Sequence, residues 1–154
     1  VTIAGQTGKV DEIELFTTRM ITPDNRLIII PNTAIFGSVI ENITAMPKRR
    51  VDVGVGTDYS ADLDQTRAVL EKVVADFEDK LEDPESVVML LELGDSCINW
   101  QVRVWASTED FWAVKQEVTR RVKMALDEAG IGIPFPQRDV NLSPAVIEAV
   151  KGRG

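Results

Sequence analysis

The chain has 154 residues and a net charge of −8 at pH 7; 44% of its residues are hydrophobic and 27% are charged. This is the composition of an ordinary globular protein, and no apolar run approaches the ~18 residues of a membrane-spanning helix. The acidic balance disfavours a nucleic-acid partner, because phosphate binding needs a basic face. Cys97 is the only cysteine and histidine is absent, so we expect no disulfide within the chain, no metal site, no cofactor and no enzymatic activity.

Residues 1–46 are expected to form a small β domain. The stretch Lys9–Leu15 follows a turn that Gly5 and Gly8 bracket, and it alternates imperfectly between apolar and polar residues. The adjacent Asp11 and Glu12 indicate a β-bulge. Four or five short strands within ~45 residues predict a small, strongly bent barrel. We expect four apolar side chains to point into it: Val10, Ile13, Leu15 and Phe16.

The stretch Ile21–Asn32 predicts a hairpin at the centre of this domain. Pro23 favours a turn, and the apolar run Leu27–Ile30 is typical of a strand buried on both faces. Pro31 ends the strand because it cannot donate to a ladder, and Asn32 is placed to cap the next segment of the chain. Residues 35–37 and 39–40 complete the domain as further strands.

Residues 47–137 are expected to form an α/β domain after the basic cluster Lys48–Arg50. This cluster is interpreted as pairing with acidic groups, with a nucleic-acid patch as the weaker interpretation. Strands are predicted at 51–55, 87–91, 98–106 and 131–135. One helix begins at the capping box of Asp62 and ends before Asp83, and another is capped by Ser107 and ends at Gly130. The resulting order is the split β-α-β pattern of a ferredoxin-like domain.

Residues 138–154 form a third segment. Arg138–Leu142 alternates as a strand but is too short to be stable without a partner strand, and Ser143 with Pro144 favours one helical turn after it. Because the chain opens in a strand-like Val-Thr-Ile without an initiator Met, we expect it to be a fragment of a longer protein.

Few residues outside the predicted core suggest a specific role. The acidic run at 76–85 lacks the spacing of a Ca²⁺ loop and is interpreted as a solvated helix end. Trp100 is expected in the core. Trp105 is expected on the opposite face of its strand, and Trp112 lies one helical step from the buried stripe, so both are candidates for contact with another subunit.

Many short motifs of this chain resemble, in the same order, those of the small-conductance mechanosensitive channel (MscS) family. The resemblance runs from about Gly5 to Leu142. It rests on ten stretches: Gly8–Val10 with Ile13 and Leu15, Thr22–Asn25, Ile30–Asn32, Ile40–Asn42, Arg49–Val51, Val55–Asp62, Leu93–Ser96, Val102–Trp105, Ala129–Ile131 and Ile133–Val140. Within them, Gly8, Pro31, Asn32, Pro134 and Pro136 are the residues expected to shape the backbone.

The resemblance implies an Sm-like β domain followed by a ferredoxin-like α/β domain on the cytoplasmic face of the inner membrane. Family members assemble as heptamers of identical subunits around a vestibule with side portals, through which ions and small solutes pass. Their C-terminal strands join into a parallel barrel, a role that Arg138, Asp139, Val140, Asn141 and Leu142 would take here. The pore-lining helix of the family would precede Val1. The whole channel would release small solutes under membrane tension during osmotic downshock.

Another class of function stays open at this point. An oligomeric Sm-like or ferredoxin-like module that binds RNA or a small ligand is the alternative, although the net charge of −8 argues against RNA. Residues 47–137 carry 11 basic and 18 acidic side chains, which suggests a preference for cations near the portals.

Overall fold

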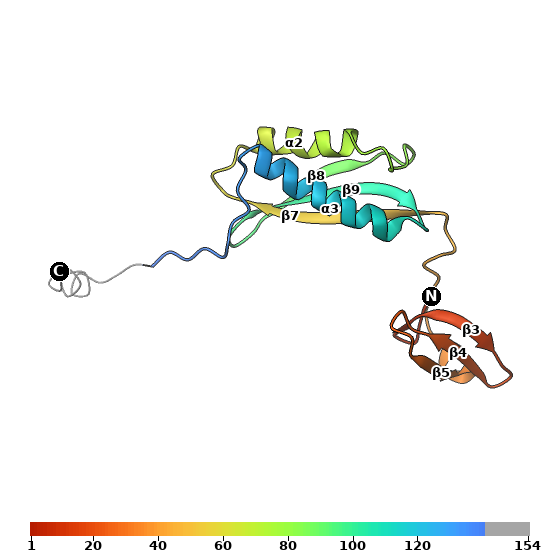
Figure 1. Cartoon of the computed structure of the whole chain (residues 1–154). Coiled ribbons are helices and arrows are strands. Elements are labelled where there is room, and N and C mark those ends of the chain that lie inside the picture. Colours follow the sequence, from red (N-terminus) through yellow and green to blue (C-terminus); the bar gives the residue numbers. More distant parts are fainter. Residues whose placement is uncertain (141–154) are drawn as a thin grey trace, which may run out of the picture. The chain divides into compact units, whose positions relative to one another are not determined.

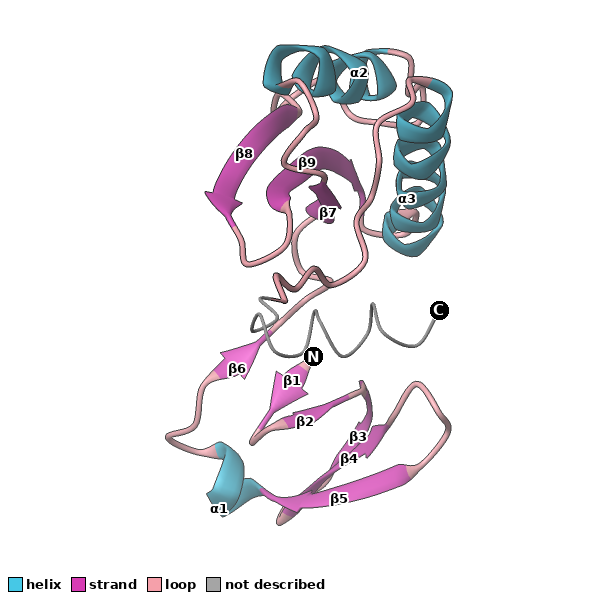
Figure 2. Ribbon diagram, turned by 90° about the vertical axis from the view of Figure 1, so that its left-hand side faces the viewer, coloured by secondary structure: helices cyan, strands magenta, loops and turns pink. Residues whose placement is uncertain are grey.

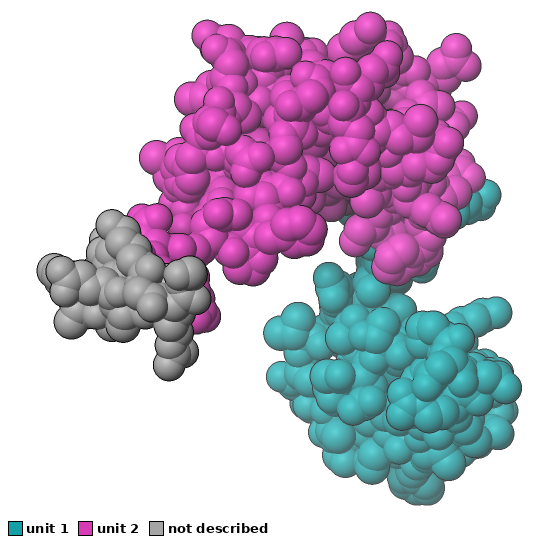
Figure 3. Space-filling model, turned by 60° about the vertical axis from the view of Figure 1, so that its left-hand side comes forward, with its two compact units in different colours: residues 1–49, 107–109 teal, residues 50–106, 110–154 magenta. Residues whose placement is uncertain are grey.

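The structure, a computed structural model, describes residues 1–140. It has the expected α+β class and divides into two compact units (Figure 3). The β unit comprises Val1–Arg49 and Ser107–Glu109. The α/β unit comprises Arg50–Ala106 and the described residues from Asp110 onward.

The β unit consists of two antiparallel sheets of three strands each. One sheet has the order β2-β1-β6 and the other the order β3-β4-β5 (Figures 1 and 2). Ile3, Met20 and Ile30 form its small buried core, and the predicted bulge is confirmed between Val10 and Glu12. The elements are β1 (Thr2–Ile3), β2 (Gln6–Thr7), β3 (Lys9–Ile13), β4 (Thr17–Ile21), β5 (Leu27–Pro31), α1 (Asn32–Ile35) and β6 (Ile40–Glu41).

The α/β unit contains one three-stranded sheet, and its two helices pack beside each other next to that sheet (Figure 2). The strand order is β7-β9-β8, so β9 lies between the strands that α2 connects, as a split β-α-β arrangement requires. The elements are β7 (Lys48–Thr57), α2 (Leu63–Ala75), β8 (Val87–Leu93), β9 (Ile98–Ser107) and α3 (Phe111–Glu128).

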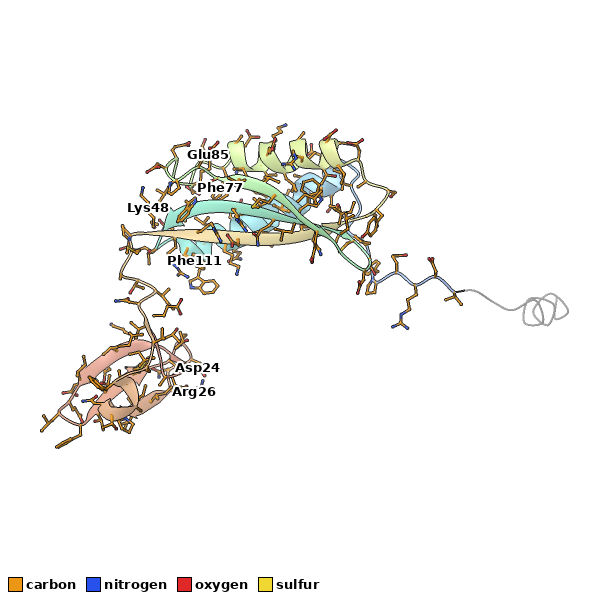
Figure 4. The ribbon with its side chains drawn as sticks, turned by 180° about the vertical axis from the view of Figure 1, so that it is seen from behind. Asp24, Arg26, Lys48, Phe77, Glu85 and Phe111 are labelled. Carbon is orange, nitrogen blue, oxygen red and sulfur yellow. The ribbon has the colours of Figure 1, made fainter. Side chains whose placement is uncertain are left out.

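The core of the α/β unit follows the predicted periodicities. Along β9 every second residue is buried, from Ile98 through Trp100 to Ala106, which confirms the predicted apolar face. The indole Nε1 of Trp100 donates to Thr57 Oγ1 at 3.1 Å, so the one polar group of this core tryptophan has a partner. Phe77, just beyond α2, is 1% exposed and lies against the sheet (Figure 4).

The inward orientation predicted for three residues of the β unit is wrong. Ile13, Leu15 and Phe16 are 73%, 82% and 77% exposed. Ile13 is the last residue of β3, and Leu15 and Phe16 lie in the turn between β3 and β4, outside the strands of the sheet. Strand β5 is likewise buried on one face only, because Leu27 and Ile29 are exposed.

Several predicted boundaries also differ from the structure. Residues 32–35 form the short helix α1, so Ile35 belongs to a helix where a strand was predicted at 35–37. The predicted cap by the Asn32 side chain is wrong, because this side chain makes no capping hydrogen bond to the helix. Helix α2 ends at Ala75, because Lys80 folds back and donates its Nζ to the carbonyls of Ala75 and Phe77. Helix α3 begins at Phe111 with Asp110 as its N-cap residue, since Ser107 still belongs to β9. The strand predicted at 131–135 is not formed; only Ile131 of that stretch is buried.

Candidate functional site: an exposed apolar surface on the β unit

The β unit carries many exposed large apolar side chains beside its core of three buried residues. We define the apolar surface as eight exposed residues: Ile13, Leu15, Phe16, Leu27, Ile29, Phe36, Val39 and Ile40. Phe36 is 92% exposed and Val39 88%. Large exposed apolar groups of this kind mark interaction sites in soluble proteins. These residues come from the end of β3, the loop after it, the outer face of β5 and the segment from α1 to β6.

Asn32 holds the loop that presents two residues of this surface. Its Nδ2 donates to the carbonyls of Glu14 at 2.9 Å and Leu15 at 3.1 Å, and its backbone N–H donates to Phe16 O at 2.8 Å. Its Oδ1 accepts from the hydroxyl of the buried Thr18 at 2.8 Å. Both the donor and the acceptor group of this amide side chain are therefore hydrogen-bonded, and they fix the backbone at Leu15 and Phe16.

The hairpin turn between β4 and β5 is held by its own side chains. Asn25 has a φ of 64°, which asparagine tolerates, and Thr22 Oγ1 accepts from the backbone N–H of Arg26 at 2.8 Å. Hydrogen bonding from Thr22, followed by the bond from the Arg26 guanidinium, lowers the pKa of Asp24 (Figure 4). The turn predicted at Pro23 is therefore confirmed.

Charged groups lie on the outer face of the β3-β4-β5 sheet. Arg19 donates to the carboxylate of Glu12 at 3.3 Å, and Glu14 lies 4.0 Å from the same guanidinium nitrogen. In the strand register Arg19 stands between Glu12 and the exposed Ile29. The outer face of this sheet therefore carries a paired arginine beside exposed aliphatic residues, a composition found at subunit interfaces.

Gly8 lies where the backbone before β3 passes close to the backbone at the end of β4. A Cβ at this position would lie 2.6 Å from the carbonyl oxygen of Ile21 and 3.1 Å from its carbon. Because the obstacle is backbone, a larger residue would force these two segments of the chain apart. Pro31 ends β5, so its missing N–H removes no bond from the middle of the ladder.

The two tryptophans proposed as interface residues lie on different elements of the α/β unit. Trp105 on β9 is half-buried, and its carbonyl accepts from Leu81 N at 2.8 Å. Trp112 on α3 is 70% exposed; its ring meets Phe111 edge-on at 5.1 Å, and Lys115 lies 5.6 Å from its centroid. Both positions leave aromatic surface open to a partner.

The C-terminal candidates lie in an extended segment. Pro134 is half-buried and Pro136 is exposed; neither belongs to a strand. Arg138, Asp139 and Val140 are exposed and have no regular structure, while Asn141 and Leu142 lie outside the described residues. Exposure of the loop at Leu15 and Phe16 was not predicted from the sequence, because the bonds from Asn32 that hold this loop span 17 and 18 residues.

A groove between α2 and α3 is a concave feature of the α/β unit. Its volume is about 550 Å³, and its lining includes Val73, Met124 and Ala125. Two charged groups of its lining are paired: Arg121 donates to Glu117 at 2.9 Å, and this bond lowers the pKa of Glu117. Within residues 1–140 no three His, Cys, Asp or Glu side chains lie close enough to hold a metal ion, and no helix there is long and apolar enough to cross a bilayer.

Comparison with known proteins places both units in one family. Residues 1–45 match the family model "Mechanosensitive ion channel, beta-domain", and residues 51–133 match "Mechanosensitive ion channel MscS, C-terminal". The small-conductance mechanosensitive channel of Edwardsiella ictaluri is 42% identical over 95% of this chain and 51% of its own length. That of Helicobacter pylori is 30% identical over 91% of this chain and 52% of its own length.

Solved structures agree with the sequence matches. The crystal structure of Helicobacter pylori MscS in the closed state superposes with a TM-score of 0.86 and 30% identity, covering 92% of this chain and 56% of that chain. Arabidopsis thaliana MSL1 has a TM-score of 0.70 at 18% identity, which shows a shared fold. The chain spans about half the length of the curated relatives it matches.

Proposed function

Because this chain belongs to the MscS family of mechanosensitive ion channels, we propose that it forms the vestibule part of a channel subunit, on the cytoplasmic side of the membrane. In this role it assembles with identical subunits and filters the solutes that reach the pore. The whole channel opens under membrane tension and releases ions and small solutes during osmotic downshock. The pore-lining helices belong to the part of the protein that precedes this chain.

The apolar surface of the β unit is the observation that carries the proposal. Leu15, Phe16 and Phe36 are each more than three-quarters exposed in a single chain, and Asn32 holds the first two in a fixed loop. A fixed loop loses little conformational entropy on association, so these side chains are suited to pack against a neighbouring subunit. Strands β3 and β5 are each paired on one side, which leaves sheet edges for that neighbour to cover.

The C-terminal residues supply the second contact in this proposal. Arg138–Leu142 would pair with their copies in neighbouring subunits as a closed parallel barrel, which removes the free edges of so short a strand. A heptamer is the expected ring. Trp105 and Trp112 are the proposed aromatic contacts on the α/β unit.

Native mass spectrometry of the chain tests the assembly. We expect a ring of identical subunits, and replacing Leu15 and Phe16 with serine should shift the population toward monomer. These side chains are exposed in the single chain, so the change should alter its own stability by at most about 0.5 kcal/mol. Leu63→Ser, at an exposed leucine of the α/β unit, is the matched control. A ring unaffected by the double substitution contradicts the role of this surface.

Deletion of residues 138–154 tests the barrel separately. Removing strands that only neighbours can pair should weaken the ring and raise the monomer fraction, while the fold of both units persists. Equal ring populations with and without these residues would refute the barrel role. The RNA-binding alternative predicts retention of labelled RNA on a filter at low salt, and the net charge of −8 predicts none.

A further inference from the structure

Three of the sequence motifs, far apart along the chain, meet at one end of the α/β unit. They are the loop after β7 with Asp58 and Tyr59, the turn from Gly94 to Ser96 between β8 and β9, and the segment Ile131–Gln137 after α3, here called the arm. Neither the core of the unit nor the apolar surface explains why these motifs carry specific polar residues.

Hydrogen bonds tie these segments together. Asp58 N donates to Gly132 O at 3.0 Å, near the start of the arm, and the backbone N–H of Gln137 donates to Ser96 Oγ at 3.1 Å, at its end. The Tyr59 hydroxyl donates to Gly94 O at 2.6 Å and so joins the two loops that hold the arm. Between its two hydrogen-bonded ends the arm is mostly exposed.

The arm also begins at a fixed point. Ile131 is 6% exposed and belongs to the buried core, and its N–H donates to Leu126 O at 2.9 Å. A Cβ on Gly132 would overlap the Asp58 carboxylate, and a Cβ on Gly94 would lie 2.8 Å from Asn99 Nδ2. The Asp58 side chain thus lies directly against the arm at Gly132, beside the hydrogen bond from Asp58 N.

We propose that Tyr59 and Ser96 are positioning residues that latch the arm, so that residues 138–140 leave the α/β unit in one direction. A strand presented in one direction needs less ordering when it pairs with its copies, so the latch favours assembly. The inference rests on the proposed function, because only there do residues 138–142 pair between subunits. The two residues act through the arm and need no contact with a neighbouring subunit.

Amide hydrogen exchange and native mass spectrometry of the 154-residue chain test the latch together. Ser96→Ala removes the acceptor of the Gln137 N–H, so exchange at Gln137 should become about tenfold faster. The ratio of ring to monomer should fall about tenfold as well. Ser96→Thr keeps the hydroxyl and should restore both values, and Tyr59→Phe should loosen the arm in the same direction. Thr119→Ala, which removes an exposed hydroxyl bonded to Lys115 O on α3, is the matched control.

The outcomes separate the latch from the proposed function. Faster exchange at Gln137 with an unchanged ring population, or unchanged exchange in Ser96→Ala, overturns the latch and leaves the proposed function standing. A unit that unfolds in Ser96→Ala would speed exchange throughout the core, including at Val102, and would also overturn the latch. A wild-type chain that stays monomeric overturns the proposed function, whatever the arm does.

Discussion

At the scale of single residues, Asn32 contributes most to the candidate interface. Its side chain makes three hydrogen bonds, one of them with the hydroxyl of the buried Thr18. Asn32→Ala should therefore destabilise the β unit by about 1–3 kcal/mol, because it releases the loop and leaves that hydroxyl without its acceptor.

The positions of the three tryptophans allow the unfolding of the two units to be measured separately. Trp100, Trp105 and Trp112 all belong to the α/β unit, so urea unfolding followed by tryptophan fluorescence reports that unit alone. Circular dichroism follows both units. Asn32→Ala should shift the part of its unfolding transition that comes from the β unit and leave the fluorescence transition in place. Asn42→Ala, which removes one long bond from Thr44, is the control. A fluorescence transition that moves with Asn32→Ala would mean that the loss is not confined to the loop.

Trp100 and Thr57 form a buried polar pair whose members depend on each other. Both are at most 1% exposed, and the indole N–H donates to the threonine hydroxyl. Trp100→Phe should cost about 2–4 kcal/mol, since it removes volume and leaves the hydroxyl unpaired. Adding Thr57→Val should cost less in that background than in the wild type. Because Trp105 and Trp112 remain, fluorescence still follows the unfolding; strictly additive costs would show that the bond is unimportant.

Glu117 gives the α/β unit a predictable dependence on acid. The bond from Arg121 lowers its pKa in the folded state, so the bond stabilises the unit above the unfolded pKa of about 4.3. That contribution is lost as the pH falls through the lower, folded pKa. Glu117→Gln should therefore flatten the loss of stability below about pH 4.3, measured by fluorescence-detected urea unfolding. A wild-type chain and variant with parallel pH profiles would contradict this.

At the scale of elements, the close approach of Gly8 to the end of β4 predicts a sensitive position. Gly8→Ala places a methyl group 2.6 Å from Ile21 O, and the backbone there cannot give way cheaply. We expect a loss of about 1–3 kcal/mol in the β unit, measured by amide exchange of β4. Gly54→Ala in β7 is the control, since its Cβ would have 3.9 Å to the nearest atom and should change stability by about 1 kcal/mol or less. Equal effects of the two substitutions would refute the steric argument.

The elements also show which predictions a sequence supports. Strand β9 and the stripe of α3 were predictable, because their periodic apolar residues pack against elements of the same chain. Leu27 and Ile29 of β5 have the same apolar character, yet they are exposed here. An apolar run indicates that a face of the strand will be covered, but it does not indicate whether the same chain or another chain covers it. Helix α2 ends earlier than predicted for a different reason. The Nζ of Lys80, five residues beyond the helix end, donates to the carbonyl of Ala75.

The candidate interface was predictable only in part. Trp112 was recognised because it falls beside the helical stripe, and it is indeed exposed. The loop at Leu15 and Phe16 was placed inward, since alternation in a five-residue strand gives no sign of where the strand leaves the sheet. The hydrogen bonds from Asn32 across 17 and 18 residues of sequence depend on the fold and leave no local pattern.

At the scale of the whole molecule, charge predicts the ion preference of the proposed channel. Residues 47–137 hold 18 acidic and 11 basic side chains, and the acidic run between α2 and β8 includes the exposed Glu78 and Glu85 (Figure 4). If this region borders the path of ions into the vestibule, its field attracts cations over roughly 10 Å at 0.1 M salt.

Glu78→Lys with Glu85→Lys should therefore lower the preference of the full-length channel for cations. Reversal potentials in asymmetric KCl, recorded under membrane tension, should shift toward the anion side, and the shift should grow as the salt is diluted because screening weakens. Glu41→Lys in the β unit changes the charge by the same amount per residue and serves as the control for a general charge effect. Identical reversal potentials at low salt in the double variant and the wild type would mean that this acidic run does not face the ion path.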